Sequence, residues 1–130
     1  MRGCIDWVLA EAGRLDVLVN NAGRLVWGPV EEVPLSVAQR MFEANFWGAA
    51  RMVNAVLPGM RARHQGRVIV VSSVASWVTV PLNGYYSASK AALSRYAEAL
   101  RHELLAVEDR VRACQETQQL RLARQRQAPR

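Results

Sequence analysis

Two stretches of sequence indicate the fold class: LDVLVNNAG at residues 15–23 and RVIVVSS at residues 67–73. Leu15–Val19 and Arg67–Val71 are short apolar runs rich in β-branched residues, and each follows a glycine within two residues, which is typical of buried strands. Their hydrophobicity is continuous rather than alternating, so both faces of each strand are expected to be covered. The pattern therefore predicts a parallel sheet packed between helices.

Two helices are predicted between and after these strands. The first spans Ser36–Arg63, with Ser36 as its N-cap, and Pro58 is expected to bend or end its last turns. Its apolar residues form two stripes, which suits a helix that packs against both a sheet and another helix. The second spans Tyr85–Val107, and one of its faces is formed by Tyr86, Lys90, Leu93, Ala97, Leu100, Leu104 and Val107. With residues 2–13 as the end of an earlier helix, the strand-helix-strand-helix order predicts right-handed βαβ units and an α/β fold.

Composition restricts the setting of the protein. The chain has 130 residues, of which 51% are hydrophobic and 22% charged, as expected for one small globular domain. Cys4 and Cys114 lie near opposite ends, so neither a zinc site nor a disulfide framework is expected, and the predicted location is the reducing cytoplasm. Residues 68–89 carry no charge, but their many Ser, Pro, Asn and Gly residues exclude a lipid-exposed helix, so no membrane partner is expected.

The positive charge is confined to the end of the chain. Residues 1–109 hold 11 basic and 10 acidic residues, whereas residues 110–130 hold six arginines and one glutamate. We therefore expect residues 1–109 to form the domain and residues 110–130 to form a basic, Gln/Arg-rich tail that is disordered or helical. Nucleic acid is not the expected partner, because residues 110–130 contain no aromatic side chain on which a base could stack.

Candidate functional residues follow the predicted strands and begin the second helix. In an open parallel sheet the reactive crevice lies beyond the carboxyl ends of the strands, where this sequence has Asn20-Asn21-Ala22-Gly23 and Ser72-Ser73. Taken alone, Asn20–Gly23 is equally well explained as a turn that ends a strand, and for Ser72-Ser73 a turn is the better explanation. Tyr86 and Lys90 are four residues apart on one helix face, and a neighbouring cation stabilises a phenolate, so Tyr86 is a candidate proton-transfer group. A packed tyrosine beside a solvated lysine is the alternative for that pair.

Taken together, these motifs resemble the short-chain dehydrogenase/reductase family. The resemblance rests on Asn20–Gly23 after the first strand, Asn45 inside the next helix, Ser73, and Tyr86-x-x-x-Lys90, all in the family's order and spacing. It implies a partial Rossmann-like, doubly wound parallel sheet, of which this chain is a central fragment. It also implies NAD(H) or NADP(H) as cofactor and a small-molecule carbonyl or alcohol as substrate.

The resemblance implies a role for each matching residue. Tyr86 is expected to be the general acid/base, and Lys90 to support it and to hold the nicotinamide ribose. Ser73 is expected to bind the substrate oxygen, and Asn45 to hold a water that relays protons. The cofactor cleft is expected to be lined by Asn20, Asn21, Ala22 and Gly23 together with Tyr86 and Lys90.

Two familiar parts of the family have no match in the sequence. The eight glycines are scattered, so the glycine-rich turn that binds the cofactor pyrophosphate is not found, and no Pro-Gly follows the segment near Asp109–Arg112 where a further strand would start. The expected sheet therefore has two strands. Two functions stay open: an oxidoreductase that interconverts a carbonyl and a secondary alcohol, and an inactive truncated relative that pairs as a homo-oligomer through its two long helices, with Trp47 as a contact.

Overall fold

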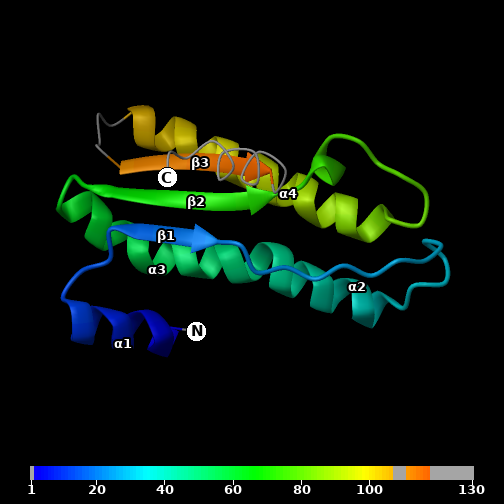
Figure 1. Ribbon diagram of the computed structural model, residues 1–130, viewed down its shortest axis with the longest axis horizontal. Coiled ribbons are helices and arrows are strands. Elements are labelled where there is room, and N and C mark those ends of the chain that lie inside the picture. The colour runs from blue at the N-terminus through cyan, green and yellow to red at the C-terminus, as the bar shows by residue number, and fades with distance from the viewer. Residues whose placement is uncertain (1, 107–110, 118–130) are drawn as a thin grey trace, which may run out of the picture.

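The computed structural model describes residues 2–106 and 111–117. Helices and strands alternate along the chain, as expected for an α/β fold (Figure 1). The elements are, in order, α1 (Arg2–Ala12), β1 (Val17–Asn20), α2 (Leu35–Phe42), a π-helical turn η1 (Glu43–Trp47), α3 (Gly48–Ala62), β2 (Gly66–Ser72), a short 3₁₀ turn η2 (Val74–Ser76), α4 (Gly84–Ala106) and β3 (Val111–Thr117). The predicted helices and the first two strands are confirmed, with small shifts at their ends.

The sheet is parallel and has three strands in the order β1-β2-β3. Val17 pairs with Arg67 on one side of β2, and Gly66 pairs with Val111 on the other. The predicted count of two strands is wrong, because Val111–Thr117 pairs along all of β2 instead of beginning a tail. This strand was not predicted because its sequence is polar, whereas backbone pairing does not require apolar side chains. The rest of the predicted tail, residues 118–130, lies outside the described residues.

The first predicted helix is continuous through α2, η1 and α3. It begins one residue earlier than expected, and the predicted cap is wrong: Ser36 lies inside the helix, and the cap residue is Pro34, which makes no side-chain capping bond. The Pro34 carbonyl instead accepts hydrogen bonds from the N–H groups of Val37 and Ala38. The helix also continues past Pro58 to Ala62, and the chain then turns at His64, which has a positive φ of 51°.

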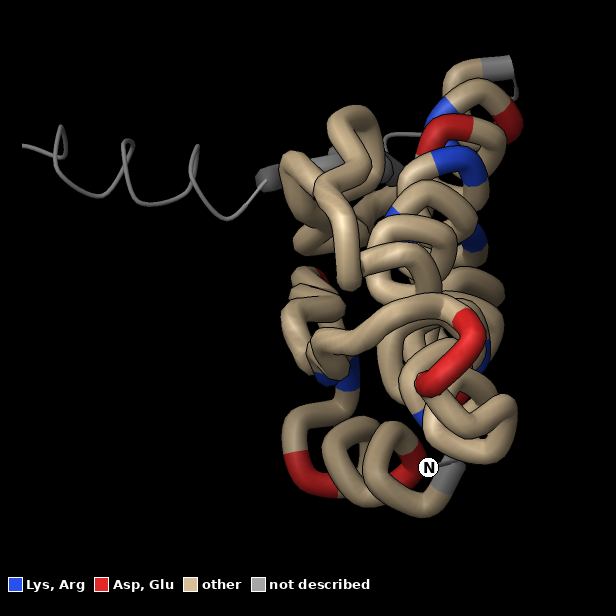
Figure 2. The backbone as a smooth tube through the Cα atoms, turned by 90° about the vertical axis from the view of Figure 1, so that its right-hand side faces the viewer, with Lys and Arg blue, Asp and Glu red and all other residues tan. Residues whose placement is uncertain are grey.

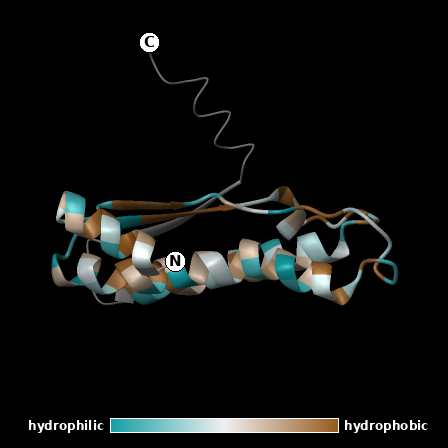
Figure 3. Ribbon diagram, turned by 90° about the horizontal axis from the view of Figure 1, so that it is seen from below, coloured by the Kyte–Doolittle hydropathy of each residue, from teal (hydrophilic) through white to brown (hydrophobic). Residues whose placement is uncertain are grey.

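The helices α3 and α4 pack on one face of the sheet, and the core lies between these helices and the sheet (Figure 3). The predicted face of α4 is confirmed, because all of its described members from Lys90 to Leu104 are buried. The expectation that both sheet faces are covered is wrong for β1, in which Val17 and Val19 are 52% and 46% exposed. The buried centre includes Leu18, Val53, Val56, Met60, Val68, Val70, Leu93, Ala97, Leu100 and Leu104.

Charged residues are scattered over the helices and loops in the view of Figure 2, without a single-sign face. Within the part of the chain that the structure describes, no helix combines the length and the apolar character needed to cross a membrane. Candidate sites on this molecule are therefore local clusters of side chains and not a charged face.

Candidate active site

A cavity of about 230 Å³ lies beyond the carboxyl ends of β1 and β2. The carboxyl ends of parallel strands meet at one edge of a sheet, and the first turns of α4 close this edge. Its lining therefore combines residues that are far apart in the sequence: Asn21, Gly23, Arg24, Leu25, Val71, Ser72, Tyr86 and Lys90.

Tyr86 and Lys90 lie one helical turn apart on α4 and both line this cavity. The Lys90 Nζ is 6.0 Å from the centre of the Tyr86 ring and donates a hydrogen bond of 3.0 Å to the Val71 carbonyl. Lys90 is only 4% exposed, and this burial lowers the pKa of its ammonium group, because desolvation disfavours the charged form. The pair therefore brings a phenol hydroxyl and a desolvated cation to the same space.

Asn45 lies behind the cavity, in the π-helical turn η1, and is completely buried. Its Oδ1 accepts a 2.6 Å hydrogen bond from the Arg24 N–H, and its Nδ2 donates to the Arg24 carbonyl and to Ser89 Oγ, both over 2.9 Å. Ser89 Oγ in turn donates to the Tyr86 carbonyl over 2.8 Å. The Asn45 side chain thus joins the loop after β1 to the turn of α4 that carries Tyr86.

Four of the residues expected at the site, Asn21, Gly23, Tyr86 and Lys90, share the cavity lining. Asn20 and Ala22 do not line it, and the Asn20 Nδ2 is buried without a hydrogen-bond partner among the described residues. Ser73 also lies outside the lining; its Oγ accepts a 3.2 Å hydrogen bond from the Ala75 N–H and thereby caps η2. The structure therefore brings together part of the predicted set.

Sequence reasoning missed several residues that build this region. Arg24 and Leu25 directly follow the Asn20–Gly23 segment and line the cavity, yet the sequence assigned them no role. Ser89, which is 0% exposed, connects Asn45 to α4. Its position three residues after Tyr86 was the available signal, since residues with this spacing lie on one helix face.

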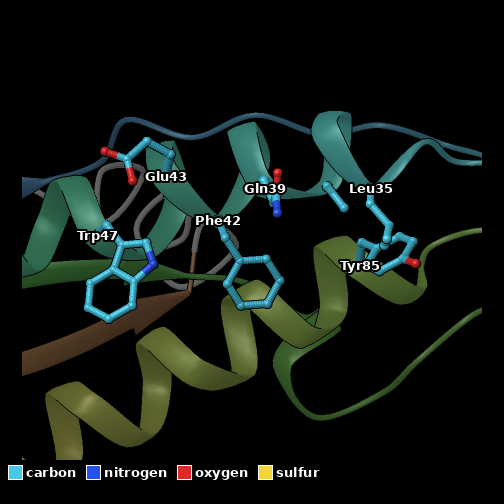
Figure 4. Close-up of a pocket in the computed structure, with 7 residues that line it drawn as sticks. Leu35, Gln39, Phe42, Glu43, Trp47 and Tyr85 are labelled. Carbon is cyan, nitrogen blue, oxygen red and sulfur yellow. The ribbon is translucent and has the colours of Figure 1, made fainter.

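A second cavity, of about 500 Å³, lies between α2 and the start of α4 and is lined by Leu35, Ala38, Gln39, Phe42, Glu43, Trp47 and Tyr85. We call it the outer groove. Figure 4 shows the rings of Phe42 and Trp47 extending from the α2–α3 helix toward α4, whereas the Glu43 carboxylate lies on the other side. Tyr85 lines the outer groove and Tyr86 lines the cavity, so the two adjacent tyrosines serve different surfaces.

Comparison with known proteins gives a consistent result. The family model described as short chain dehydrogenase matches residues 1–116. Retinol dehydrogenase 8 of Homo sapiens is 50% identical over 93 residues, which cover 72% of this chain and 30% of that protein. A short chain dehydrogenase/reductase from Burkholderia phymatum, solved in complex with NAD, has a TM-score of 0.86 at 27% identity and is matched over 89% of this chain and 42% of its own.

A metagenomic short-chain oxidoreductase solved in complex with NADP gives a TM-score of 0.83 at 30% identity, over 89% of this chain and 52% of its own. The chain thus spans between 30% and 52% of the length of these three proteins. The sequence match and the fold agree with each other. This chain belongs to the short chain dehydrogenase family.

Proposed function

We propose that this chain carries the proton-transfer part of an NAD(P)-dependent oxidoreductase site that interconverts a carbonyl and a secondary alcohol. The observation that supports this most is the shared cavity of Tyr86 and Lys90 at the carboxyl edge of the sheet. A phenol is a weak acid near neutral pH, and a desolvated cation beside it favours release of its proton. Similar structures hold NAD and NADP, which supports a nicotinamide cofactor of either kind.

Each residue has a distinct task in this proposal. The Tyr86 hydroxyl donates its proton to the carbonyl oxygen as that oxygen becomes an alkoxide, and the phenolate removes the proton in the reverse direction. Lys90 supplies the positive charge that stabilises the phenolate. By resemblance, Ser73 donates its hydroxyl proton to the substrate oxygen; its Oγ accepts from the Ala75 N–H and lies next to the cavity lining, beside Ser72. Asn45 holds the Arg24 loop in place and, by resemblance, a relay water.

The residues around Gly23 fit the ribose and nicotinamide end of the cofactor. A Cβ atom at Gly23 would lie 3.2 Å from Asn45 Oδ1 and 3.5 Å from Lys90 Nζ, so the missing side chain keeps the space in front of Lys90 open. Asn21, Gly23 and Lys90 would hold the ribose hydroxyls there. When bound, the nicotinamide supplies or accepts the hydride.

The proposal is tested by following the reduction of small aromatic ketones and aldehydes with NADH and with NADPH, each at high concentration because these residues alone are expected to bind a dinucleotide weakly. Tyr86→Phe removes only the ionisable hydroxyl and is expected to lower kcat by roughly 100-fold or more. Tyr96→Phe is the matched control, because Tyr96 is also on α4 but packs against Phe46, at 5.8 Å between ring centres, and does not line the cavity. Ser73→Ala should also reduce turnover, but by an amount that varies from one substrate to another more than it does for Tyr86→Phe. Equal rates for Tyr86→Phe and Tyr96→Phe would show that Tyr86 is not the acid/base.

The second candidate function is that of a catalytically inactive, truncated family member that forms a homo-oligomer. The outer groove favours it, since Leu35 and Trp47 at its border are 68% and 52% exposed and apolar. Size-exclusion chromatography with light scattering should then give a dimer, and Trp47→Ser should shift it toward monomer. A wild-type protein that is monomeric at high concentration would reject this function. The cytoplasmic location stays a prediction.

A further inference from the structure

Arg24 follows the Asn20–Gly23 segment and lines the same cavity as Tyr86 and Lys90. Its backbone is held on both sides by one buried side chain: the Arg24 N–H donates to Asn45 Oδ1 over 2.6 Å, and the Arg24 carbonyl accepts from Asn45 Nδ2 over 2.9 Å. Asn45 is itself joined to α4 through Ser89. The base of the Arg24 side chain is therefore positioned relative to the two residues of the proton-transfer pair.

The cavity lining is positively charged. Two of its eight residues, Arg24 and Lys90, are cations, and none is a carboxylate. Elsewhere, carboxylates pair with arginines on the surface: Asp16 with Arg14, Glu43 with Arg51 and Glu98 with Arg95. Among the described residues, no carboxylate forms such a pair with Arg24.

The two cations differ in what they can still bind. The Lys90 Nζ already donates to the Val71 carbonyl and is almost fully buried. Arg24 is exposed, and its guanidinium keeps a planar set of N–H donors that matches the two oxygens of a carboxylate. An anionic ligand group in this cavity is therefore best bound by Arg24.

We propose that Arg24 is a specificity-determining residue that binds an anionic group, foremost a carboxylate, on the substrate. The inference rests on the proposed function of the same cavity. A substrate held in this way presents its carbonyl or hydroxyl carbon to Tyr86 and its carboxylate to Arg24. The substrate class is therefore keto acids and hydroxy acids, in preference to neutral ketones and alcohols.

The test measures binding by isothermal titration of two probes of nearly the same shape, the anionic 4-acetylbenzoate and the neutral 4-acetylbenzamide. The wild-type chain is expected to bind the acid roughly 10-fold more tightly than the amide, as is common for a charge-assisted hydrogen bond. Arg24→Gln should abolish this preference and Arg24→Lys should keep part of it. Arg40→Gln makes the same change of net charge at an exposed position on α2 outside the cavity, and it should keep the full preference.

Several results would overturn the proposal: equal affinities for the two probes, no binding of either probe, or a preference that survives Arg24→Gln. A parallel titration with NADH and NADPH tests whether Arg24 binds a cofactor phosphate instead of a substrate carboxylate. The proposal would also be overturned if Arg24→Gln weakened the binding of the dinucleotides but not that of 4-acetylbenzoate. Tyr86→Phe separates this inference from the proposed function. It should abolish hydride transfer but leave the preference for the acid, so that each idea can fail alone.

Discussion

At the scale of single residues, the candidate site depends on one chain of buried and partly buried hydrogen bonds. Both amide N–H groups of Asn45 and its oxygen have protein partners, and one of these partners, Ser89, passes the connection on to the Tyr86 carbonyl. A buried donor that loses its acceptor keeps the full desolvation penalty. The position of Tyr86 is therefore coupled to a serine that has no part in the proposed chemistry.

Ser89→Ala should destabilise the fold by about 1–3 kcal/mol, because it leaves one Asn45 N–H buried without an acceptor. Ser87→Ala is the matched control on the same helix, since the Ser87 Oγ is buried and has no partner among the described residues. That control should be neutral or slightly stabilising. Urea denaturation measures both, and equal losses in the two variants would contradict the role given to Ser89.

Lys90 predicts a pH-dependent stability. Burial lowers its pKa in the folded state below the ordinary value of 10.5, so the unfolded chain binds more protons and folding becomes more favourable as the pH rises through the interval between the two pKa values. The penalty for the buried charge is fully present below that interval. Lys90→Met removes it, and the stability of this variant relative to wild type should therefore fall as the pH rises from neutral toward about 10.5. The variant also lacks the Val71 hydrogen bond, but the slope depends only on the difference between the folded and unfolded pKa values of Lys90. Urea denaturation across this pH range measures the free energy of unfolding of both proteins. A difference between Lys90→Met and wild type that rises with pH or stays constant would contradict the expectation.

At the scale of elements, the contact between α3 and β2 is set by a glycine. The chain leaves α3, turns through His64 at positive φ and enters β2 at Gly66, directly over Met60. A Cβ atom at Gly66 would lie 2.5 Å from both Cγ and Sδ of Met60 and 2.8 Å from its Cβ. Met60 is fully buried in the core, so it has little space into which to move.

Gly66→Ala should therefore destabilise the protein by about 1–3 kcal/mol through overpacking. Gly3→Ala is the matched control, because a Cβ at Gly3 meets nothing within 4 Å and alanine is the better helix former in α1. The control should be neutral or stabilising by up to about 1 kcal/mol. Thermal and urea denaturation measure both changes, and a Gly66→Ala protein as stable as wild type would mean that α3 and β2 can separate at little cost.

At the scale of the whole molecule, the cavity is small for the cofactor that the family uses. Its volume of about 230 Å³ is below the range of roughly 300–1,000 Å³ usual for complete small-molecule sites. The sequence also shows no glycine-rich turn to bind a pyrophosphate at a helix N-terminus. Both observations support the proposal that these residues contact the nicotinamide ribose end of a dinucleotide and not its adenylate half.

The 130 residues alone should therefore bind NADH and NADPH very weakly, and reduced nicotinamide mononucleotide about as well as either. The mononucleotide lacks the adenylate half, for which the sequence contains no recognisable site. Isothermal titration of the three compounds measures this. Micromolar affinity for a dinucleotide together with much weaker binding of the mononucleotide would show that a second binding element exists.

Features that arise from near neighbours in the chain could be predicted from the sequence alone. The long helices, the first two strands and the buried face of α4 follow from local periodicity, and the proximity of Tyr86 to Lys90 follows from their four-residue spacing on one helix. The family resemblance also came from motifs that are read in order along the chain. These features depend only on helix and strand geometry, which the local sequence encodes.

Features that join distant segments became visible only in the folded molecule. Asn45 forms hydrogen bonds with residues that are 21 and 44 positions away, and the first of these contacts holds Arg24 at the cavity. The strand β3 joins the sheet through backbone pairing, which its polar sequence does not predict. The exposure of Val17 and Val19 likewise depends on which elements lie over the sheet, and not on the strand's own hydrophobicity. The physical reason is that such contacts are selected by the packing of the complete core, in which each side chain competes for the same space and the same partners.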